Sequence, residues 1–207
     1  MNSATELKQT LRDRYNAVRK AIDPAAAGRK SIRVAANILS LLKLRGSELI
    51  MVYHKIGAEV DAFPLTDLIL DSGLGVALPY CRKDGKLGIG RILNPRDDLV
   101  EGAYGIMEPA DRLKDNIRPA QLSAIVCPGV AFDKERTRLG RGAGYYDRFL
   151  QELTGKPLII GCAFDCQISA EPLPREPHDI PMDAVIAETL AFPVGCCPAI
   201  KPPEEEA

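Results

Sequence analysis

Four short apolar runs constrain the fold of this chain more than any other feature. They cover residues 49–53, 123–127, 158–164 and 184–187, and nearly every position in them is apolar. Continuous apolar sequence, as opposed to alternation, is typical of parallel strands that are buried on both faces. Helical spacing of apolar residues recurs before and between these runs. The pattern predicts an α/β domain of three layers, in which helices flank a mainly parallel central sheet.

The length and the end of the sequence set the expected domain limits. A chain of 207 residues suits one domain with a single core. We expect that single α/β domain to span residues 1–195. Residues 196–207 are rich in proline and glutamate, so we expect them to form a disordered tail.

Charge and cysteine content exclude several classes of protein. The 27 basic and 28 acidic side chains nearly cancel, which argues against a protein that binds nucleic acid or a membrane surface. The six cysteines form no Cys-x-x-Cys pair and only two histidines occur, which argues against structural zinc. Cys127 and Cys162 lie in apolar runs, so we expect buried thiols. Because no secretory signal or span-length apolar run is present, we expect a cytoplasmic protein.

The segment from Arg138 to Asp147 is the strongest candidate for a binding site. Its sequence, Arg-Leu-Gly-Arg-Gly-Ala-Gly-Tyr-Tyr-Asp, places three alternating glycines between a predicted strand and a predicted helix. Glycines let backbone N–H groups approach a ligand closely, and a helix N-terminus favours an anion. Asp147 falls in the first helical turn, where it could hold Mg²⁺ against that anion.

The spacing of these glycines matches neither a P-loop nor a dinucleotide fingerprint. A solvated loop in which the glycines merely turn is the alternative. Five basic residues around the loop favour an oligophosphate ligand, because one charge-assisted hydrogen bond contributes about 1.5–3 kcal/mol. These residues are Lys134, Arg136, Arg138, Arg141 and Arg148.

Further candidates lie on the first predicted helix and after the first strand. Lys8, Arg12 and Arg19 share one helix flank, which is either a solvated basic face or a ridge aimed at the same phosphates. The irregular segment 54–61 follows a strand and should lie at the carboxyl edge of the sheet with the glycine loop. Asp183 precedes its strand, so this rule does not place it.

Together these segments resemble the 5-formyltetrahydrofolate cyclo-ligase family, also called methenyltetrahydrofolate synthetase. Residues 128–133 and 138–147 match the family's signature, which is a specific match. The other matching pieces are Lys8 with Arg12, Tyr53 with residues 59–61, residues 102–109 and residues 178–183. The resemblance covers residues from about 5 to about 190. Four positions depart from the family pattern: Arg136 where glycine is common, Ala62 and Ala187 where threonine is usual, and Ala143 at a variable position.

The resemblance implies an activity and its partners. The family closes 5-formyltetrahydrofolate to 5,10-methenyltetrahydrofolate, with ATP as co-substrate and Mg²⁺ as cofactor, and releases ADP and phosphate. The partners would therefore be a reduced folate and ATP, and we expect a monomer.

The resemblance also assigns roles to residues. The ATP site would contain Lys8, Arg12, Arg138, Leu139, Gly140, Arg141, Gly142, Ala143, Gly144, Tyr145 and Tyr146. The folate site would contain His54, Glu59, Arg141, Gly142, Ala143, Gly144 and Tyr145. The catalytic group would be Arg138, Arg141 and Tyr145, and the metal ligands would be Asp147 and Asp183. Judged from the residues alone, His54 has the pattern of a structural histidine, Asp183 that of a turn residue, and Tyr146 that of a core residue on its helix.

Other functions could use a similar phosphate loop. They are a kinase or other nucleotide-dependent transferase, a regulatory nucleotide-binding protein, and an isomerase that binds a sugar monophosphate. The segment around Glu59 separates these readings, because a protein that only binds ATP does not need it.

Overall fold

The computed structural model describes residues 4–102, 105–177, 179–193, 195–197 and 199–200. The order of the helices and strands bears out the predicted α/β class. The helices of this part of the chain are α1 (Ala4–Lys20), α2 (Pro24–Leu44), α3 (Phe63–Asp71) and α4 (Tyr145–Gln151).

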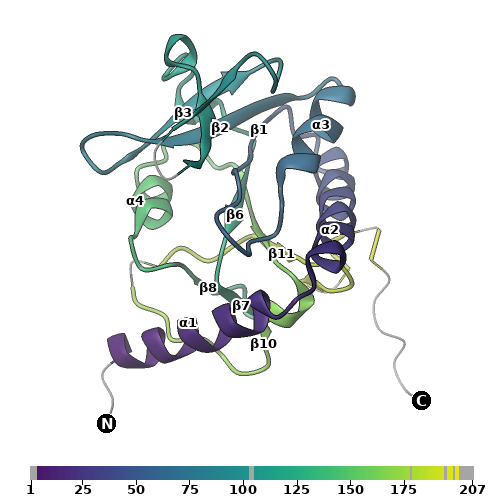
Figure 1. The fold of residues 1–207 in the computed structure, drawn as a ribbon, viewed down its shortest axis with the longest axis vertical. Helices are drawn as coiled ribbons and strands as arrows, with labels where there is room; N and C mark the ends of the chain where they lie inside the picture. The colour runs from purple at the N-terminus through teal and green to yellow at the C-terminus, as the bar shows by residue number, and fades with distance from the viewer. Residues whose placement is uncertain (1–3, 103–104, 178, 194, 198, 201–207) are drawn as a thin grey trace.

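A seven-stranded sheet forms the centre of the molecule, in the order β12-β11-β9-β6-β1-β2-β3 (Figure 1). The five inner strands pair in parallel, and the strand at each edge pairs antiparallel to its neighbour. The sheet is therefore mainly parallel, as expected. Its strands are β1 (Leu49–Met51), β2 (Gly75–Cys81), β3 (Leu87–Ile92), β6 (Ala124–Pro128), β9 (Leu158–Cys162), β11 (Ala184–Ile186) and β12 (Ala191–Phe192).

Alternate residues of each inner strand pack on opposite faces of the sheet. Ile50 packs with the buried side chains of α2 and α3, whereas its neighbour Met51 packs with Phe149 of α4. Figure 1 shows α2 and α3 on one side of the sheet and α4 on the other. Because both faces are covered, the strands are apolar throughout, which explains the continuous runs in the sequence. Cys127 and Cys162 are buried on the sheet, as predicted.

Two small sheets extend this core. The antiparallel pair β4 (Leu99–Glu101) and β5 (Met107–Pro109) lies against β2 and β3, and the sequence did not predict it. The second sheet, in the order β10-β7-β8, contains β7 (Ala131–Asp133), β8 (Arg138–Leu139) and β10 (Ile168–Ser169). α1 packs beside this second sheet, so it lies near the start of the glycine loop (Figure 1).

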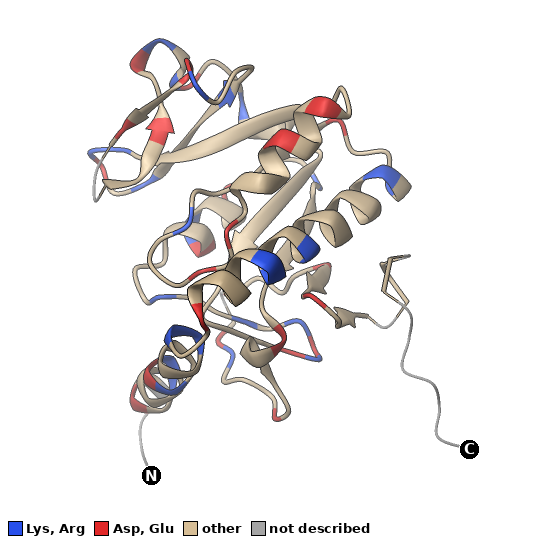
Figure 2. Cartoon of the chain, turned by 45° about the vertical axis from the view of Figure 1, so that its right-hand side comes forward, with Lys and Arg blue, Asp and Glu red and all other residues tan. Residues whose placement is uncertain are grey.

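The C-terminal segment packs further than expected. Cys197 is buried, and its thiol donates to the carbonyl of Asn37 in α2. Ordered packing therefore continues past residue 195, and residues 201–207 of the predicted tail lie outside the described part of the chain. Basic and acidic residues are interspersed along the chain (Figure 2), and no described helix is long and apolar enough to cross a membrane.

Candidate ATP and folate site

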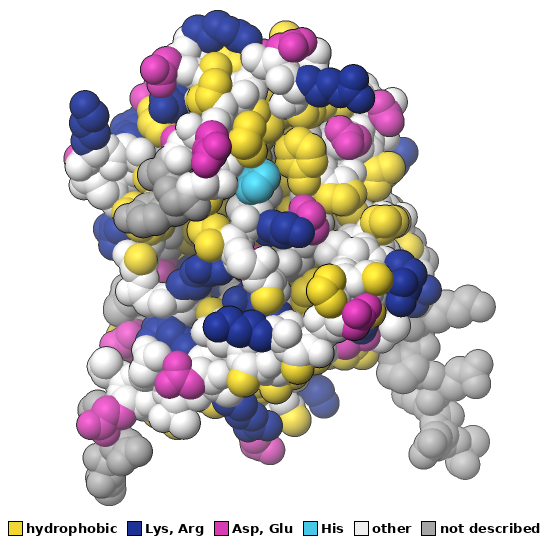
Figure 3. All heavy atoms as spheres, viewed as in Figure 1, with side chains coloured by type: hydrophobic (Ala, Val, Ile, Leu, Met, Phe, Trp, Pro, Cys, Tyr) yellow, Lys and Arg dark blue, Asp and Glu magenta, His cyan; other side chains and the backbone are white. Residues whose placement is uncertain are grey.

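A pocket opens at the carboxyl edge of the central sheet, where the loops after β1 and β6 meet the glycine loop. It encloses about 880 Å³, open mouth included. Its walls come from the segment after β1, from β2 and β3, from β5, and from the glycine loop with the start of α4. On this face of the molecule, apolar side chains gather around the histidine, and Lys and Arg side chains lie below it (Figure 3).

The glycine loop leads into the N-terminus of α4, as the sequence predicted. Gly142 has φ +106° and Gly144 has φ +68°, which other residues rarely adopt. Gly144 is the N-cap of α4, so the free N–H groups of the first helical turn face the loop. Arg148 donates to the carbonyl of Ala143 at 3.1 Å, which holds the loop against the helix.

Arg138 and Asp147 form an ion pair across the two ends of this segment. The Arg138 side chain is only 5% exposed, whereas the Asp147 carboxylate is 24% exposed. Arg138 also lies over the ring of Tyr146, with 5.7 Å between the guanidinium carbon and the ring centroid. The pair therefore places one buried cation and one accessible acid at the glycine loop.

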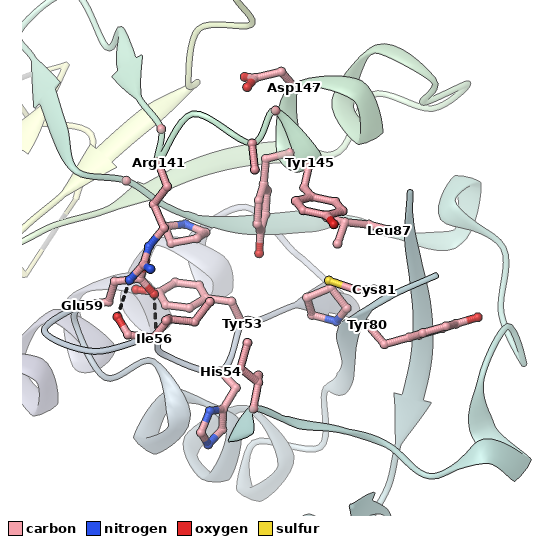
Figure 4. A pocket seen from close by; sticks show the side chains of 18 of the residues that line it. Tyr53, His54, Ile56, Glu59, Tyr80, Cys81, Leu87, Arg141, Tyr145 and Asp147 are labelled. Carbon is pink, nitrogen blue, oxygen red and sulfur yellow. Dashed lines mark hydrogen bonds and ion pairs between the residues drawn. The ribbon is translucent and has the colours of Figure 1, made fainter. Parts of the chain in front are cut away.

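A second ion pair joins the glycine loop to the segment after β1 (Figure 4). Arg141 Nε donates to Glu59 Oε1 at 2.8 Å, and the backbone N–H of Ile56 donates to Glu59 Oε2 at 2.8 Å. Arg141 also donates to the carbonyl of Ile56. Both oxygens of the buried Glu59 carboxylate are thus hydrogen-bonded, and two segments 82 residues apart are fixed together over one pocket.

Helix α1 approaches the same loop from outside the pocket. Arg12 Nε donates to the carbonyl of Gly140 at 3.0 Å. Lys8 pairs with Glu176 at 2.6 Å and with Asp179 at 2.9 Å. Burial opposes the charge of Lys8, but its hydrogen bonds to both carboxylates outweigh that effect and raise its pKa. Arg19 is buried and donates to the carbonyl of Gly129, so it supports the loop after β6.

Comparison with known proteins identifies the family. A sequence model of the 5-formyltetrahydrofolate cyclo-ligase family matches residues 4–188. The chain belongs to this family. The cyclo-ligase of Escherichia coli K12 is 31% identical over 179 residues, which are 84% of this chain and 96% of that protein. The cyclo-ligase of Mycolicibacterium smegmatis is 33% identical over 152 residues, which are 72% and 77% of the two chains.

Solved structures agree with this family assignment. The NMR structure of 5,10-methenyltetrahydrofolate synthetase from Aquifex aeolicus is 35% identical, with a TM-score of 0.78 over 90% of this chain and 92% of that one. A 5,10-methenyltetrahydrofolate synthetase from Mycoplasma pneumoniae has the same fold, with a TM-score of 0.69 over 87% and 98% of the two chains, at 22% identity.

Most residues that the cyclo-ligase resemblance assigned to the site lie together. Those that line the pocket are His54, Glu59, Arg138, Gly140, Arg141, Ala143, Gly144, Tyr145, Tyr146 and Asp147. Leu139 does not: its side chain is buried with Tyr15 and Leu173, so only its backbone is available to a ligand. Gly142 in the loop, and Lys8 and Arg12 on α1, do not line the pocket, although Arg12 contacts the loop at Gly140.

The structure does not bring Asp183 to Asp147. Asp183 lies before β11, and its carboxylate accepts the N–H of Ile159 at 2.8 Å, at the start of β9. It lines a separate groove at the amino edge of the sheet. A parallel strand separates its two ends, so an acid that precedes β11 is remote from a site at the carboxyl edge. The same loop instead places Asp179 beside Lys8.

The tyrosines and the histidine of the pocket have distinct environments. Tyr146 is partly buried, its buried hydroxyl has no hydrogen-bond partner among the described residues, and burial raises its pKa well above the ordinary value. Tyr145 is accessible in the pocket and lies under the guanidinium of Arg148. The ring of His54 packs edge-on against Phe63, with 5.9 Å between the ring centroids, and its buried Nδ1 has no hydrogen-bond partner in the described part of the chain.

Arg136, which replaces a common family glycine, keeps the glycine conformation. Its φ is +69°, in the left-handed region. Its carbonyl accepts the N–H of Met182, and Asp133 accepts the N–H of Thr137 at 2.8 Å, so the turn is fixed from both sides. The turn therefore retains its shape at the expense of backbone strain of about 1–2 kcal/mol.

The part of the pocket away from the glycine loop contains a residue that the sequence did not single out. Glu108 of β5 lines this end with Ile106, Tyr80, Cys81 and Leu87. Glu108 had one signal in the sequence: it lies in residues 102–109, which resemble a segment of the cyclo-ligase family but have no helix or strand pattern. Within the described part of the chain, no group of three or more His, Cys, Asp or Glu side chains forms a metal cluster.

Proposed function

We propose that this protein closes 5-formyltetrahydrofolate to 5,10-methenyltetrahydrofolate, using ATP and releasing ADP and phosphate. Membership of the cyclo-ligase family and the fold shared with the Aquifex aeolicus synthetase support this activity. The observation that carries it is the ion pair between Arg141 and Glu59. It joins an anion-binding loop to the segment that matches the family's folate-contacting region, so two ligands can meet in one pocket.

The chemistry explains why both ligands must meet. The formamide carbon of the substrate is a poor electrophile, because its nitrogen donates electrons into the carbonyl. Transfer of the terminal phosphoryl group of ATP to the formyl oxygen makes that oxygen a leaving group. N10 of the folate then attacks the carbon, and phosphate departs as the conjugated ring forms. The protein has to position the reactants and neutralise charge during phosphoryl transfer.

The site residues suit these tasks. The backbone N–H groups of the glycine loop and the guanidinium of Arg138 would bind the ATP phosphates, with Lys8 and Arg12 supporting them from α1. Arg141 and Tyr145 line the pocket, where they would lie between the phosphates and the folate. Glu59 would hold Arg141 in place and line the folate region.

Asp147 at the loop fits a magnesium ion. Mg²⁺ is usually held by one or two carboxylates together with substrate phosphates and waters, and does not need a cage of protein ligands. Asp147 presents an accessible carboxylate in the first turn of α4, beside the loop. Asp179, paired with Lys8, is the second acid that we propose in place of Asp183. The bound ion would offset the phosphate charge.

One assay tests the activity directly. Purified protein is mixed with 5-formyltetrahydrofolate and Mg-ATP, and the absorbance of the methenyl product is followed, with ATP omitted in a parallel sample. We expect product only when ATP is present. Equal turnover without ATP, or no product with it, contradicts the proposal.

A variant connects this activity to the loop. Arg138→Ala should raise the KM for ATP about ten- to a hundredfold, because one charge-assisted phosphate bond is lost. Arg118→Ala removes an exposed arginine outside the pocket and serves as the matched control. If the two variants have the same ATP saturation, Arg138 does not contact the nucleotide.

A further inference from the structure

Glu108 is a buried carboxylate that is only weakly paired within the described part of the chain. The residue is 6% exposed and lines the pocket. Among the described residues its carboxylate accepts no hydrogen bond, and its one ion pair joins Oε2 to Lys114 Nζ at 3.8 Å. Burying a charge is costly unless it is paired and hydrogen-bonded. A carboxylate in this position therefore suits a ligand that brings its own donors.

The neighbouring residues keep this carboxylate available. Lys114 has a closer partner than Glu108, because its Nζ lies 2.9 Å from Asp111. The same Nζ lies over the Tyr80 ring, 5.0 Å from its centre. Gly102 leaves room on the other side: a Cβ there would lie 2.3 Å from the carboxyl carbon of Glu108. Any larger residue at position 102 would displace the carboxylate, so the hairpin is built around it.

The other acid of the folate region differs in this respect. Both oxygens of Glu59 are occupied by the Ile56 N–H and by Arg141, each at 2.8 Å. Glu59 therefore has its hydrogen-bonding capacity filled from within the protein. Of the two buried acids that line the pocket, only Glu108 has oxygens open to a ligand.

Glu108 also lies at the far end of the pocket from the Arg141–Glu59 pair. Cys81, Leu87 and Tyr80 lie away from Arg141 and Glu59, with Tyr145 between the two groups (Figure 4). Lys114 Nζ lies 3.8 Å from Glu108 Oε2 and 5.0 Å from the centre of the Tyr80 ring, so Glu108 lies on the Tyr80 side of the pocket. The pocket thus has a cationic, phosphate-binding end and an acidic end, with apolar walls between them.

A reduced pterin has the complementary arrangement. Its pyrimidine ring carries two neighbouring donors, the 2-amino group and N3–H, which can bind the two oxygens of one carboxylate side by side, as a guanidinium does. The formyl group on N5 lies across the bicyclic ring from the 2-amino group. A pterin that directs its formyl oxygen to the phosphates would direct its two donors away from them, towards the acidic end.

We propose that Glu108 binds the 2-amino and N3–H donors of the pterin ring and thereby selects the substrate and orients its formyl group. This inference rests on the proposed cyclo-ligase activity, because it takes the reacting oxygen to lie at the glycine loop. Glu108 would then bind the folate directly and would not contact ATP.

The test compares Glu108→Gln with the natural protein on two ligands. One is 5-formyltetrahydrofolate, and the other is its analogue in which a methyl group replaces the 2-amino group. Glutamine keeps the shape but offers only one acceptor oxygen. We expect the folate KM to rise about ten- to a hundredfold in the variant, while the KM for ATP changes less than twofold. The natural protein should bind the analogue at least tenfold more weakly by calorimetry, and the variant should lose most of this discrimination.

Controls separate this inference from the activity on which it rests. Glu101→Gln changes an exposed acid on the same hairpin and should leave both KM values unchanged. Failure of the natural protein to form product refutes the cyclo-ligase function. Product formation with equal binding of both folates refutes only the role of Glu108, and so does an equal rise of both KM values in the variant. If Glu108→Gln does not fold, the binding of the two folates to the natural protein decides the question.

Discussion

Replacing Glu59 by glutamine tests whether its ion pair organises the folate region. Glutamine has the same shape, but an NH₂ group takes the place of one oxygen. Either the N–H of Ile56 or the Nε of Arg141 then loses its acceptor, since each donates to a separate oxygen at 2.8 Å. A hydrogen bond to a charged group contributes about 1.5–3 kcal/mol. Because the Arg141 side chain is 43% exposed, water replaces part of this, and we expect a loss of about 1.5–2 kcal/mol.

This loss should be visible in thermal unfolding and in substrate saturation. For a chain of this size, 1 kcal/mol shifts the unfolding temperature by about 2–4 °C, so Glu59→Gln should unfold about 3–8 °C lower. Arg141 loses its fixed position, so the KM for the folate should rise more than the KM for ATP. Glu135→Gln, an exposed acid outside the pocket, is the control. An unchanged unfolding temperature, or a larger effect on ATP than on folate, would refute the reasoning.

Four further changes have expected outcomes. Gly142→Ala forces a side chain onto φ +106°, so ATP saturation should weaken and unfolding should become easier by about 1–3 kcal/mol, measured by nucleotide titration and denaturant unfolding. Asp147→Asn should raise the Mg²⁺ concentration needed for turnover at least tenfold, whereas Asp183→Asn should lower the unfolding temperature and leave the Mg²⁺ titration unchanged. Arg136→Gly relieves a left-handed residue and should stabilise the fold by about 0.5–1 kcal/mol in denaturant, after the entropy that glycine loses on folding is subtracted. Burial raises the pKa of the Cys127 thiol to about 12, so iodoacetamide at pH 8 should label it only after unfolding; labelling of the folded protein would contradict this.

The central sheet could be predicted because its signal is local. Each inner strand is covered on both faces, so burial leaves a continuous apolar run such as residues 158–164, which contains β9. The glycine loop was equally predictable, since the positive φ angles of Gly142 and Gly144 favour glycine. Strand order was not predicted, because it depends on contacts between distant segments.

The acids of the site could not be predicted from local sequence. Glu108 belongs to a three-residue strand that exists only through its pairing with β4, so neither its burial nor its direction had a local signal. Asp183 and Asp179 are four residues apart in one loop, yet Asp183 binds the start of β9 and Asp179 binds Lys8 of α1. The path of the chain between them places Asp179, and not Asp183, beside α1.

The pair between Arg138 and Asp147 has a consequence for the form in which the nucleotide binds. In the free protein each of these charges neutralises the other. In the proposed ATP complex the phosphates would attract the guanidinium, and the carboxylate would lose its partner close to several negative oxygens. A divalent ion carried in with the nucleotide would supply the replacement, so both charges would change partners in one event. We therefore expect nucleotide alone to bind weakly, and the metal complex to be the form that the protein accepts.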